Sequence, residues 1–116
     1  MQGYNVTCCL RSHETLRCSA FLCNTNEDIK KHLRVEGKPL EISKIRVTDN
    51  FSIFHNLNAE NKMGIGVTGR VKDKDGDWHF FTGDIVIFKE DNNALVDITQ
   101  EEIDFVVSKL ITGGAR

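Results

Sequence analysis

The sequence predicts an α+β fold: an antiparallel, strongly twisted sheet of five to seven strands with two helices, the C-terminal helix packed on the sheet. Strands are indicated by short stretches in which apolar and polar residues alternate and which end at turn residues. Helices are indicated by two segments that open with a threonine and an acidic residue three positions later. The chain has 116 residues, 40% of them hydrophobic, a size and composition typical of one domain, here residues 1–116.

The N-terminal part is predicted to be a hairpin followed by a short helix. Apolar side chains alternate over residues 4–10 and again over residues 16–22, and this pairing places Cys8 across from Cys18. The helix begins after Thr25, has Asp28 three positions on, and stops at Gly37. Its apolar face is small, so we expect it to lie on the sheet and bury a modest area.

The middle of the chain is predicted to be mostly strand. Three alternating stretches cover residues 42–47, 51–57 and 65–71. Asp75-Gly76 is a strong hairpin signal, since glycine adopts the positive φ that a tight turn needs. Residues 78–88 then read as one long strand with a bulge or bend at Gly83, and with Trp78 and Phe80 on its core face.

The second helix has the clearest signals. Thr99 and Glu102 form a capping-box pattern, with Ile98 and Ile103 placed as a hydrophobic staple. Gly113-Gly114 ends the predicted helix. The predicted core face consists of Ile103, Val106, Val107, Leu110 and Ile111.

The charge of the chain and the lack of targeting signals in its sequence limit the partners and the location that we expect. The net charge is -2, which argues against long nucleic acid or an anionic membrane as the main partner. The balance is +3 over residues 1–46 (eight bases, five acids) and -6 over residues 73–116 (four bases, ten acids). No segment has the length and apolarity of a membrane span or the pattern of a signal peptide, so we expect a cytoplasmic protein. Exposed sheet edges favour a homo-oligomer.

The four cysteines are read as reduced thiols that pack as small hydrophobic residues. Their spacing does not fit the close ligand pairs of a zinc site, so no metal site is predicted.

Two stretches of the sequence match ligand-binding motifs, but the residues around them do not fit the structures that these motifs need. The stretch from Gly64 to Gly69 matches G-x-G-x-x-G, yet a strand rather than a helix is predicted to follow, which argues against dinucleotide binding. The acids around Gly76 resemble a calcium loop, but Val71 and Thr82 occupy positions that need strong oxygen ligands. A hairpin turn accounts for these acids better.

No catalytic residue and no cofactor is predicted. The four histidines are dispersed, and no serine or cysteine lies in a recognisable nucleophile motif. Binding chemistry is easier to assign, because a small nucleotide carries few phosphates and needs only a pair of arginines and an aromatic ring. The predicted ligand-binding residues are Arg11, Arg17, Arg70, Trp78 and Phe81.

Three segments resemble the C-terminal half of a family of small uncharacterised proteins of phages and mobile elements. They are the D-x-D-G turn ending at Gly76, the strand with Gly83 before its aliphatic end, and the helix start around Thr99. The resemblance implies a viral protein that acts on a bacterial host. In size and mixed make-up the chain is also similar to the sponge proteins that disarm bacterial immunity by sequestering a nucleotide signal.

Together these observations lead to three functional hypotheses. The first is a non-enzymatic phage anti-defence protein that sequesters a cyclic oligonucleotide or a cyclic ADP-ribose type of signal. The second is a phage inhibitor that binds a host protein through its acidic C-terminal half. The third is a small enzyme that acts on nucleotides.

Overall fold

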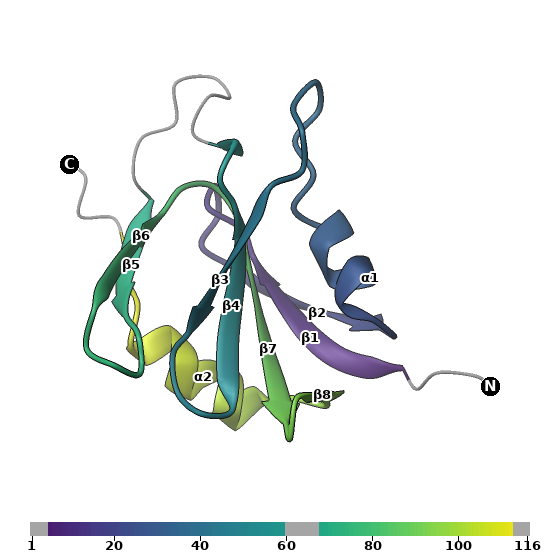
Figure 1. Ribbon diagram of the computed structural model, residues 1–116, viewed down its shortest axis with the longest axis vertical. Coiled ribbons are helices and arrows are strands. Elements are labelled where there is room, and N and C mark those ends of the chain that lie inside the picture. The colour runs from purple at the N-terminus through teal and green to yellow at the C-terminus, as the bar shows by residue number, and fades with distance from the viewer. Residues whose placement is uncertain (1–4, 60–67, 113–116) are drawn as a thin grey trace.

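This computed structural model describes residues 5–59 and 68–112, which contain nine strands and two helices (Figure 1). In chain order they are β1 (Val6–Arg11), β2 (Cys18–Cys23), α1 (Asn26–Lys31), β3 (Ile42–Arg46), β4 (Phe51–Asn56), β5 (Gly69–Lys72), β6 (Trp78–Phe81), β7 (Ile85–Asp91), β8 (Ala94–Val96), α2 (Gln100–Ser108) and β9 (Ile111–Thr112). The predicted α+β fold with a C-terminal helix is confirmed.

The strands form two antiparallel sheets. The larger has six strands in the order β2-β1-β7-β4-β3, with β8 paired to β7, and the smaller has the order β6-β5-β9. Strands β8 and β9 and the small sheet itself were not predicted, because short strands of two or three residues have no measurable alternation.

The single long strand predicted over residues 78–88 is wrong. The chain leaves the small sheet after β6, bends at Gly83, and enters the centre of the large sheet as β7. Gly83 has a φ of +81°, and a Cβ there would lie 2.9 Å from the Cβ of Ala59. The bend predicted at this glycine is therefore present, but it divides the segment between two sheets.

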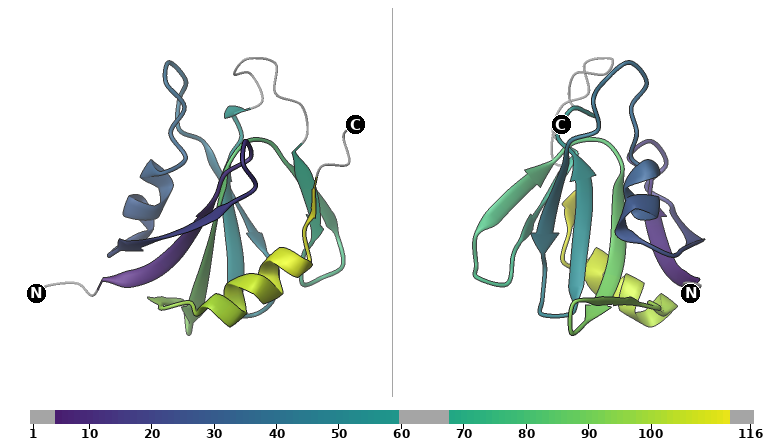
Figure 2. Two further views of the ribbon diagram at one scale, coloured as in Figure 1. Left: turned by 180° about the vertical axis from the view of Figure 1, so that it is seen from behind. Right: turned by 45° about the vertical axis from the view of Figure 1, so that its right-hand side comes forward.

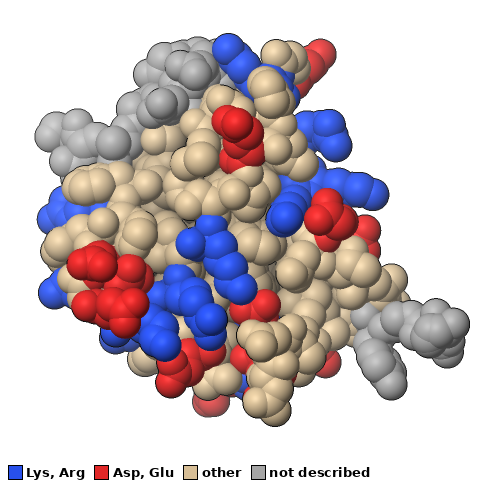
Figure 3. Space-filling view, viewed as in Figure 1, with Lys and Arg blue, Asp and Glu red and all other residues tan. Residues whose placement is uncertain are grey.

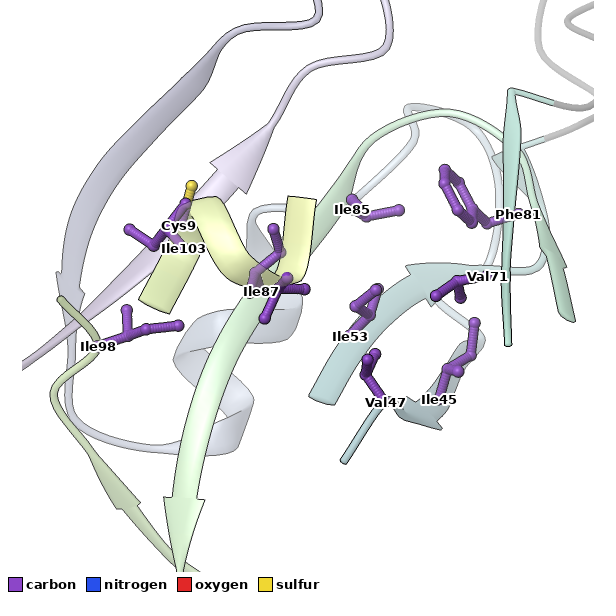
Figure 4. Packing of buried hydrophobic residues seen from close by; sticks show 11 residues of the cluster. Cys9, Ile45, Val47, Ile53, Val71, Phe81, Ile85, Ile87, Ile98 and Ile103 are labelled. Carbon is purple, nitrogen blue, oxygen red and sulfur yellow. The ribbon is translucent and has the colours of Figure 1, made fainter. Parts of the chain in front are cut away.

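Two hydrophobic cores lie on the two faces of the large sheet, and Figure 2 shows α1 on one side of this sheet and α2 on the other. On one face, Ile29 of α1 and Leu33 pack against Phe54 and Phe88. On the other face, the small sheet and α2 pack against the strands of the large sheet. That core is shown in Figure 4 and includes Cys9, Ile45, Ile53, Val71, Phe81, Ile85, Ile87, Ile103 and Val106.

Both helix starts are as predicted, but both helices end early. The hydroxyl of Thr25 accepts from the backbone N–H of Asp28 at 3.2 Å, and Thr99 and Glu102 form the full capping box. Helix α1 ends at Lys31, well before Gly37, and α2 ends at Ser108. Leu110 and Ile111 therefore lie outside the helix, and Ile111 belongs to β9, contrary to the predicted core face.

The alternation in β6 is the reverse of the predicted one. Trp78 and Phe80 are exposed, by 46% and 58%, whereas Phe81 is only 3% exposed. The reason is the absence of a side chain on Gly69 of the neighbouring strand, since a Cβ there would lie 2.6 Å from the Cζ atom of Phe81. The Phe81 ring fills that space, and Trp78 and Phe80 therefore face outward.

Some of the residues on which the sequence predictions rest lie outside the residues that the structure describes. Gly64, Gly66, Gly113 and Gly114 lie outside them. Gly69 opens strand β5, so a strand follows this stretch, as expected. Among the described residues, neither helix has the length and apolar character needed to cross a membrane.

Candidate functional site

An open groove lies between the C-terminal end of α2, the β5–β6 hairpin and the segment that precedes β4. Figure 2 (left) shows the end of α2 beside this hairpin, and β9, which follows the helix, pairs with β5. The groove has a volume of about 460 Å³, within the roughly 300–1,000 Å³ typical of small-molecule sites. It is lined by Val47, Thr48, Lys72, Asp73, Lys74, Phe105, Ser108 and Lys109. We call it the lysine groove.

Two of its lysines have no acidic partner. The Nζ atom of Lys72 lies 5.2 Å from the centre of the Trp78 ring, and that of Lys109 lies 5.0 Å from the centre of the Phe105 ring. Neither ammonium group pairs with a carboxylate of the residues that the structure describes. Each is held by a cation–π contact, which positions the charge without neutralising it.

The third lysine and the one acid of the groove are already engaged. Lys74 forms an ion pair with Asp49 at 2.8 Å. Asp73 accepts hydrogen bonds from the backbone N–H groups of Asp75 and Asp77, both at 2.9 Å, and contacts Nε2 of His79 at 2.7 Å. The contact with His79, followed by these backbone bonds, lowers the pKa of the Asp73 carboxyl. Asp73 therefore organises the hairpin turn as an anion.

Phe105 provides an aromatic surface beside these charges. Phe105 is 43% exposed, and its ring packs against that of Phe51, with the ring centres 5.8 Å apart. Phe105 and Lys109 are four residues apart at the end of α2, so they lie on the same side of the helix. Helix geometry thus brings a stacking surface and a free ammonium together.

Of the predicted ligand-binding residues, the structure brings Arg70 and Trp78 together. The guanidinium carbon of Arg70 lies 5.3 Å from the centre of the Trp78 ring, on the outer face of the small sheet. The same ring contacts Lys72. Arg70 and Trp78 therefore border the lysine groove, although they do not line it.

The other three predicted residues lie elsewhere. Arg11 is half-buried at the end of β1, and Arg17 is exposed in the loop before β2. Arg11 and Phe81 line a shared cavity of only about 10 Å³, room for about one water molecule. Because Phe81 is buried in the core, its ring is not available to stack on a base in this structure.

A second polar cluster, the histidine cavity, lies at the other end of β4. It has a volume of about 70 Å³ and is lined by His13, His32, Leu33, Arg34, Val35, Asn56, Ala59, Gly83 and Asp84. Asp84 accepts from the backbone N–H of His13 at 2.9 Å and contacts its Nδ1 at 2.7 Å. The side-chain amide of Asn56 donates to the backbone oxygen of Leu33 at 2.9 Å. These polar groups join neighbouring loops to one another.

Sequence reasoning missed Lys72, Lys109 and Phe105. The i,i+4 spacing of Phe105 and Lys109 is a signal that could have been used. Lys72 had no such signal, since its place beside α2 depends on how the small sheet packs. Within residues 5–59 and 68–112, no group of three His, Cys, Asp or Glu side chains is arranged to hold a metal ion.

Comparison with known proteins adds no relative to this picture. No family model, no curated protein and no solved structure matches the chain.

Proposed function

We propose that the lysine groove binds the phosphate groups of a small nucleotide and that the protein holds this ligand without transforming it. The observation that carries the proposal is the pair of lysines, Lys72 and Lys109, that share one groove and lack acidic partners among the described residues. A lysine ammonium binds phosphate as a compact point charge and needs no fixed geometry.

The remaining parts of the groove fit a nucleotide. The exposed ring of Phe105 offers a stacking surface for a base, and such stacking is worth roughly 1–3 kcal/mol per base. Arg70, held over Trp78 at the border, adds a further cation for a ligand with more than one phosphate. The groove volume suits a ligand of this size better than the histidine cavity or the small cavity beside Phe81 does.

Acidic side chains near the groove favour a small ligand over a long polyanion. Asp75 and Asp77 are exposed at the tip of the β5–β6 hairpin. Figure 3 shows acidic atoms gathered at this tip beside basic atoms over β3. A strand of nucleic acid would have to pass these acids, whereas a compact ligand carries its few charges within the groove.

The wider biological role stays a prediction. Sequestration of a cyclic oligonucleotide or a cyclic ADP-ribose type of immune signal by a phage protein follows from the resemblance described above. The lysine groove supports the ligand-binding part of that prediction.

The test is a thermal-shift and calorimetric screen of the full chain. The probes are a cyclic dinucleotide, a cyclic trinucleotide, cyclic ADP-ribose and ADP-ribose, with adenosine as the control that lacks phosphate. We expect at least one phosphate-bearing probe to raise the melting temperature and release or absorb heat, and adenosine to do neither. A flat response to all four probes, or an equal response to adenosine, would reject the proposal. Chromatography of the recovered ligand separates binding from turnover, since an enzyme would return an altered molecule.

A second candidate function is inhibition of a host protein. The outer face of the small sheet exposes Trp78, Phe80 and Ile111 beside the acidic hairpin tip, and exposed apolar patches with a polar rim mark protein-binding surfaces. Association with a basic protein would slow strongly as ionic strength rises, which distinguishes it from a ligand held by the groove.

A further inference from the structure

Cys9 and Cys18 lie on the same face of the β1–β2 hairpin. Cys9 pairs with Ala20 and Arg11 pairs with Cys18 in the antiparallel register, so Cys9 and Cys18 are diagonal neighbours. Diagonal neighbours on one face of an antiparallel pair are about 7–8 Å apart, and strand twist can bring such a pair closer, since Cys8 and Cys23, which are also diagonal in this register, have their sulfur atoms 3.1 Å apart. This register replaces the predicted pairing of Cys8 with Cys18, since Cys8 lies opposite Phe21.

The two thiols differ in access. Cys18 is exposed on the edge strand β2, contrary to its expected role as a buried hydrophobic residue, whereas Cys9 is fully buried in the core. The Nη1 atom of Arg11 lies 3.5 Å from the sulfur of Cys18. Reactive cysteines lie in accessible settings with a cationic neighbour, and Cys18 has both features.

A second pair of thiols occupies the opposite face and provides an internal contrast. The sulfur atoms of Cys8 and Cys23 are 3.1 Å apart, but the two residues are only 0% and 4% exposed. Burial is the main reason that the pKa of each thiol is raised. This pair is close enough to bridge, yet it is shielded from solvent and disfavoured as thiolate.

We propose that Cys18 is the reactive thiol of a hydroperoxide oxidation site and that Cys9 is its resolving partner. An accessible thiol with a cationic neighbour and a second thiol beside it is the arrangement found in peroxide-sensitive pairs. The inference does not depend on the proposed ligand, because the hairpin does not line the lysine groove.

The reaction balances with hydrogen peroxide as the oxidant. The Cys18 thiolate attacks one peroxide oxygen, the O–O bond breaks, and the departing hydroxide takes up a proton to become water. Cys18 is thereby oxidised by two electrons to sulfenic acid, and the peroxide is reduced. The Cys9 sulfur then attacks the Cys18 sulfur, the S–O bond breaks, and hydroxide leaves with the Cys9 proton as a second water. The net change is two thiols and one peroxide to one disulfide and two waters.

Burial, followed by the neighbouring Cys18, raises the pKa of Cys9 to about 12. Cys9 therefore stays protonated at neutral pH and does not react first. Its role begins when Cys18 has been oxidised.

The test is brief exposure of the folded full chain to hydrogen peroxide, followed by alkylation of the remaining thiols in denaturant and intact-mass analysis. We expect the wild type to lose two alkylatable thiols and to regain them on treatment with dithiothreitol. Trypsin cannot assign the bridge, because cleavage after Arg11 and Arg17 leaves Cys8 with Cys9 and Cys18 with Cys23. Variants must assign it.

Three cysteine variants separate the two pairs, and a fourth variant tests the role of Arg11. Cys23→Ala should still form the bridge, and Cys18→Ser, a change at an exposed position, should form none. Cys9→Ala should leave a Cys18 sulfenic acid that dimedone traps. Arg11→Gln removes the cation that lies beside the Cys18 sulfur and should slow the oxidation of Cys18. A bridge in Cys18→Ser that is lost in Cys23→Ala, or a wild type that keeps all four thiols, would overturn the proposal.

Discussion

The lysine groove and the histidine cavity lie at opposite ends of β4 and differ in how their charges are used. In the histidine cavity Asp84 bonds to His13 and the Asn56 amide bonds to the backbone of Leu33, and the volume is only about 70 Å³. In the lysine groove, the ammonium groups of Lys72 and Lys109 contact aromatic rings and form no ion pair with a residue that the structure describes, and the groove has a volume of about 460 Å³. The difference teaches that a polar cluster whose members satisfy each other stabilises the fold, whereas unpaired charge beside open space is available to a ligand.

Charge reversal in the groove should have the largest effect on binding. Hydrogen bonds to charged groups contribute roughly 1.5–3 kcal/mol each, so Lys72→Glu with Lys109→Glu should weaken binding of the active nucleotide by at least about 100-fold. The measurement is calorimetric titration at fixed salt. The matched control is Lys31→Glu with Lys38→Glu, which makes the same change of charge at two exposed lysines outside the groove. Equal losses in the control and in the double variant would show that net charge, not the groove, is responsible.

The histidine cavity should give the opposite result. Asp84→Ala removes two hydrogen bonds to His13 and should lower the free energy of unfolding by roughly 1–3 kcal/mol. Nucleotide affinity should be unchanged at a temperature where the variant is folded. Urea denaturation measures the first quantity, and titration measures the second. Asp75→Ala, at an exposed acid on the hairpin tip, is the control and should leave stability within about 0.5 kcal/mol of wild type. A fall in nucleotide affinity in Asp84→Ala would indicate that the ligand binds at the histidine cavity, which would contradict our proposal that it binds in the lysine groove.

A smaller effect is expected at the border of the groove. Trp78 holds Lys72 by a cation–π contact, worth about 0.5–1 kcal/mol at exposed sites. Trp78→Leu should therefore weaken nucleotide binding only about two- to fivefold and leave stability nearly unchanged. A loss as large as that of the double lysine variant would move the base-binding surface from Phe105 to Trp78.

Acid sensitivity near neutral pH should arise at the cavity end of β4. Burial, with a smaller contribution from His79, lowers the pKa of His55, and its Nδ1 has no hydrogen-bond partner among the described residues. The unfolded chain therefore takes up a proton at a higher pH than the folded chain does. Stability should be full above the ordinary histidine pKa of 6.5 and should fall as the pH drops below it.

The substitution that isolates this effect is His55→Leu, which replaces the ring with an apolar side chain. Urea denaturation at a series of pH values should show a flatter profile for the variant than for the wild type between neutral pH and pH 5. Parallel profiles would assign the acid sensitivity to another group.

Local rules predicted much of this fold because they act over a few residues. The capping box at Thr99 and the tight turn at Gly76, whose φ is +92°, follow from neighbouring side chains and backbone freedom alone. The division of residues 78–88 between two sheets does not follow from such rules. Alternation reports which residues share a face, but not which sheet a strand joins or which face is inside.

The candidate site was harder to predict for the same reason. Arg70 and Trp78 were chosen for their chemistry and do lie together, because β5 and β6 are joined by a short turn. Phe81 was chosen by the same reasoning, yet its ring is buried in the core, in the space that Gly69 leaves because it has no side chain. The lysine groove combines three segments that are distant in sequence, so only the tertiary packing of α2 against the small sheet brings them together.

The most direct test of the central claim is an NMR titration of ¹⁵N-labelled protein with each nucleotide of the screen. We expect at least one nucleotide to shift the backbone amide signals of Thr48, Lys72, Asp73 and Lys109, and to leave those of His13 and Asp84 in place. If no nucleotide perturbs the groove, or if the shifts gather at the histidine cavity instead, the account is contradicted.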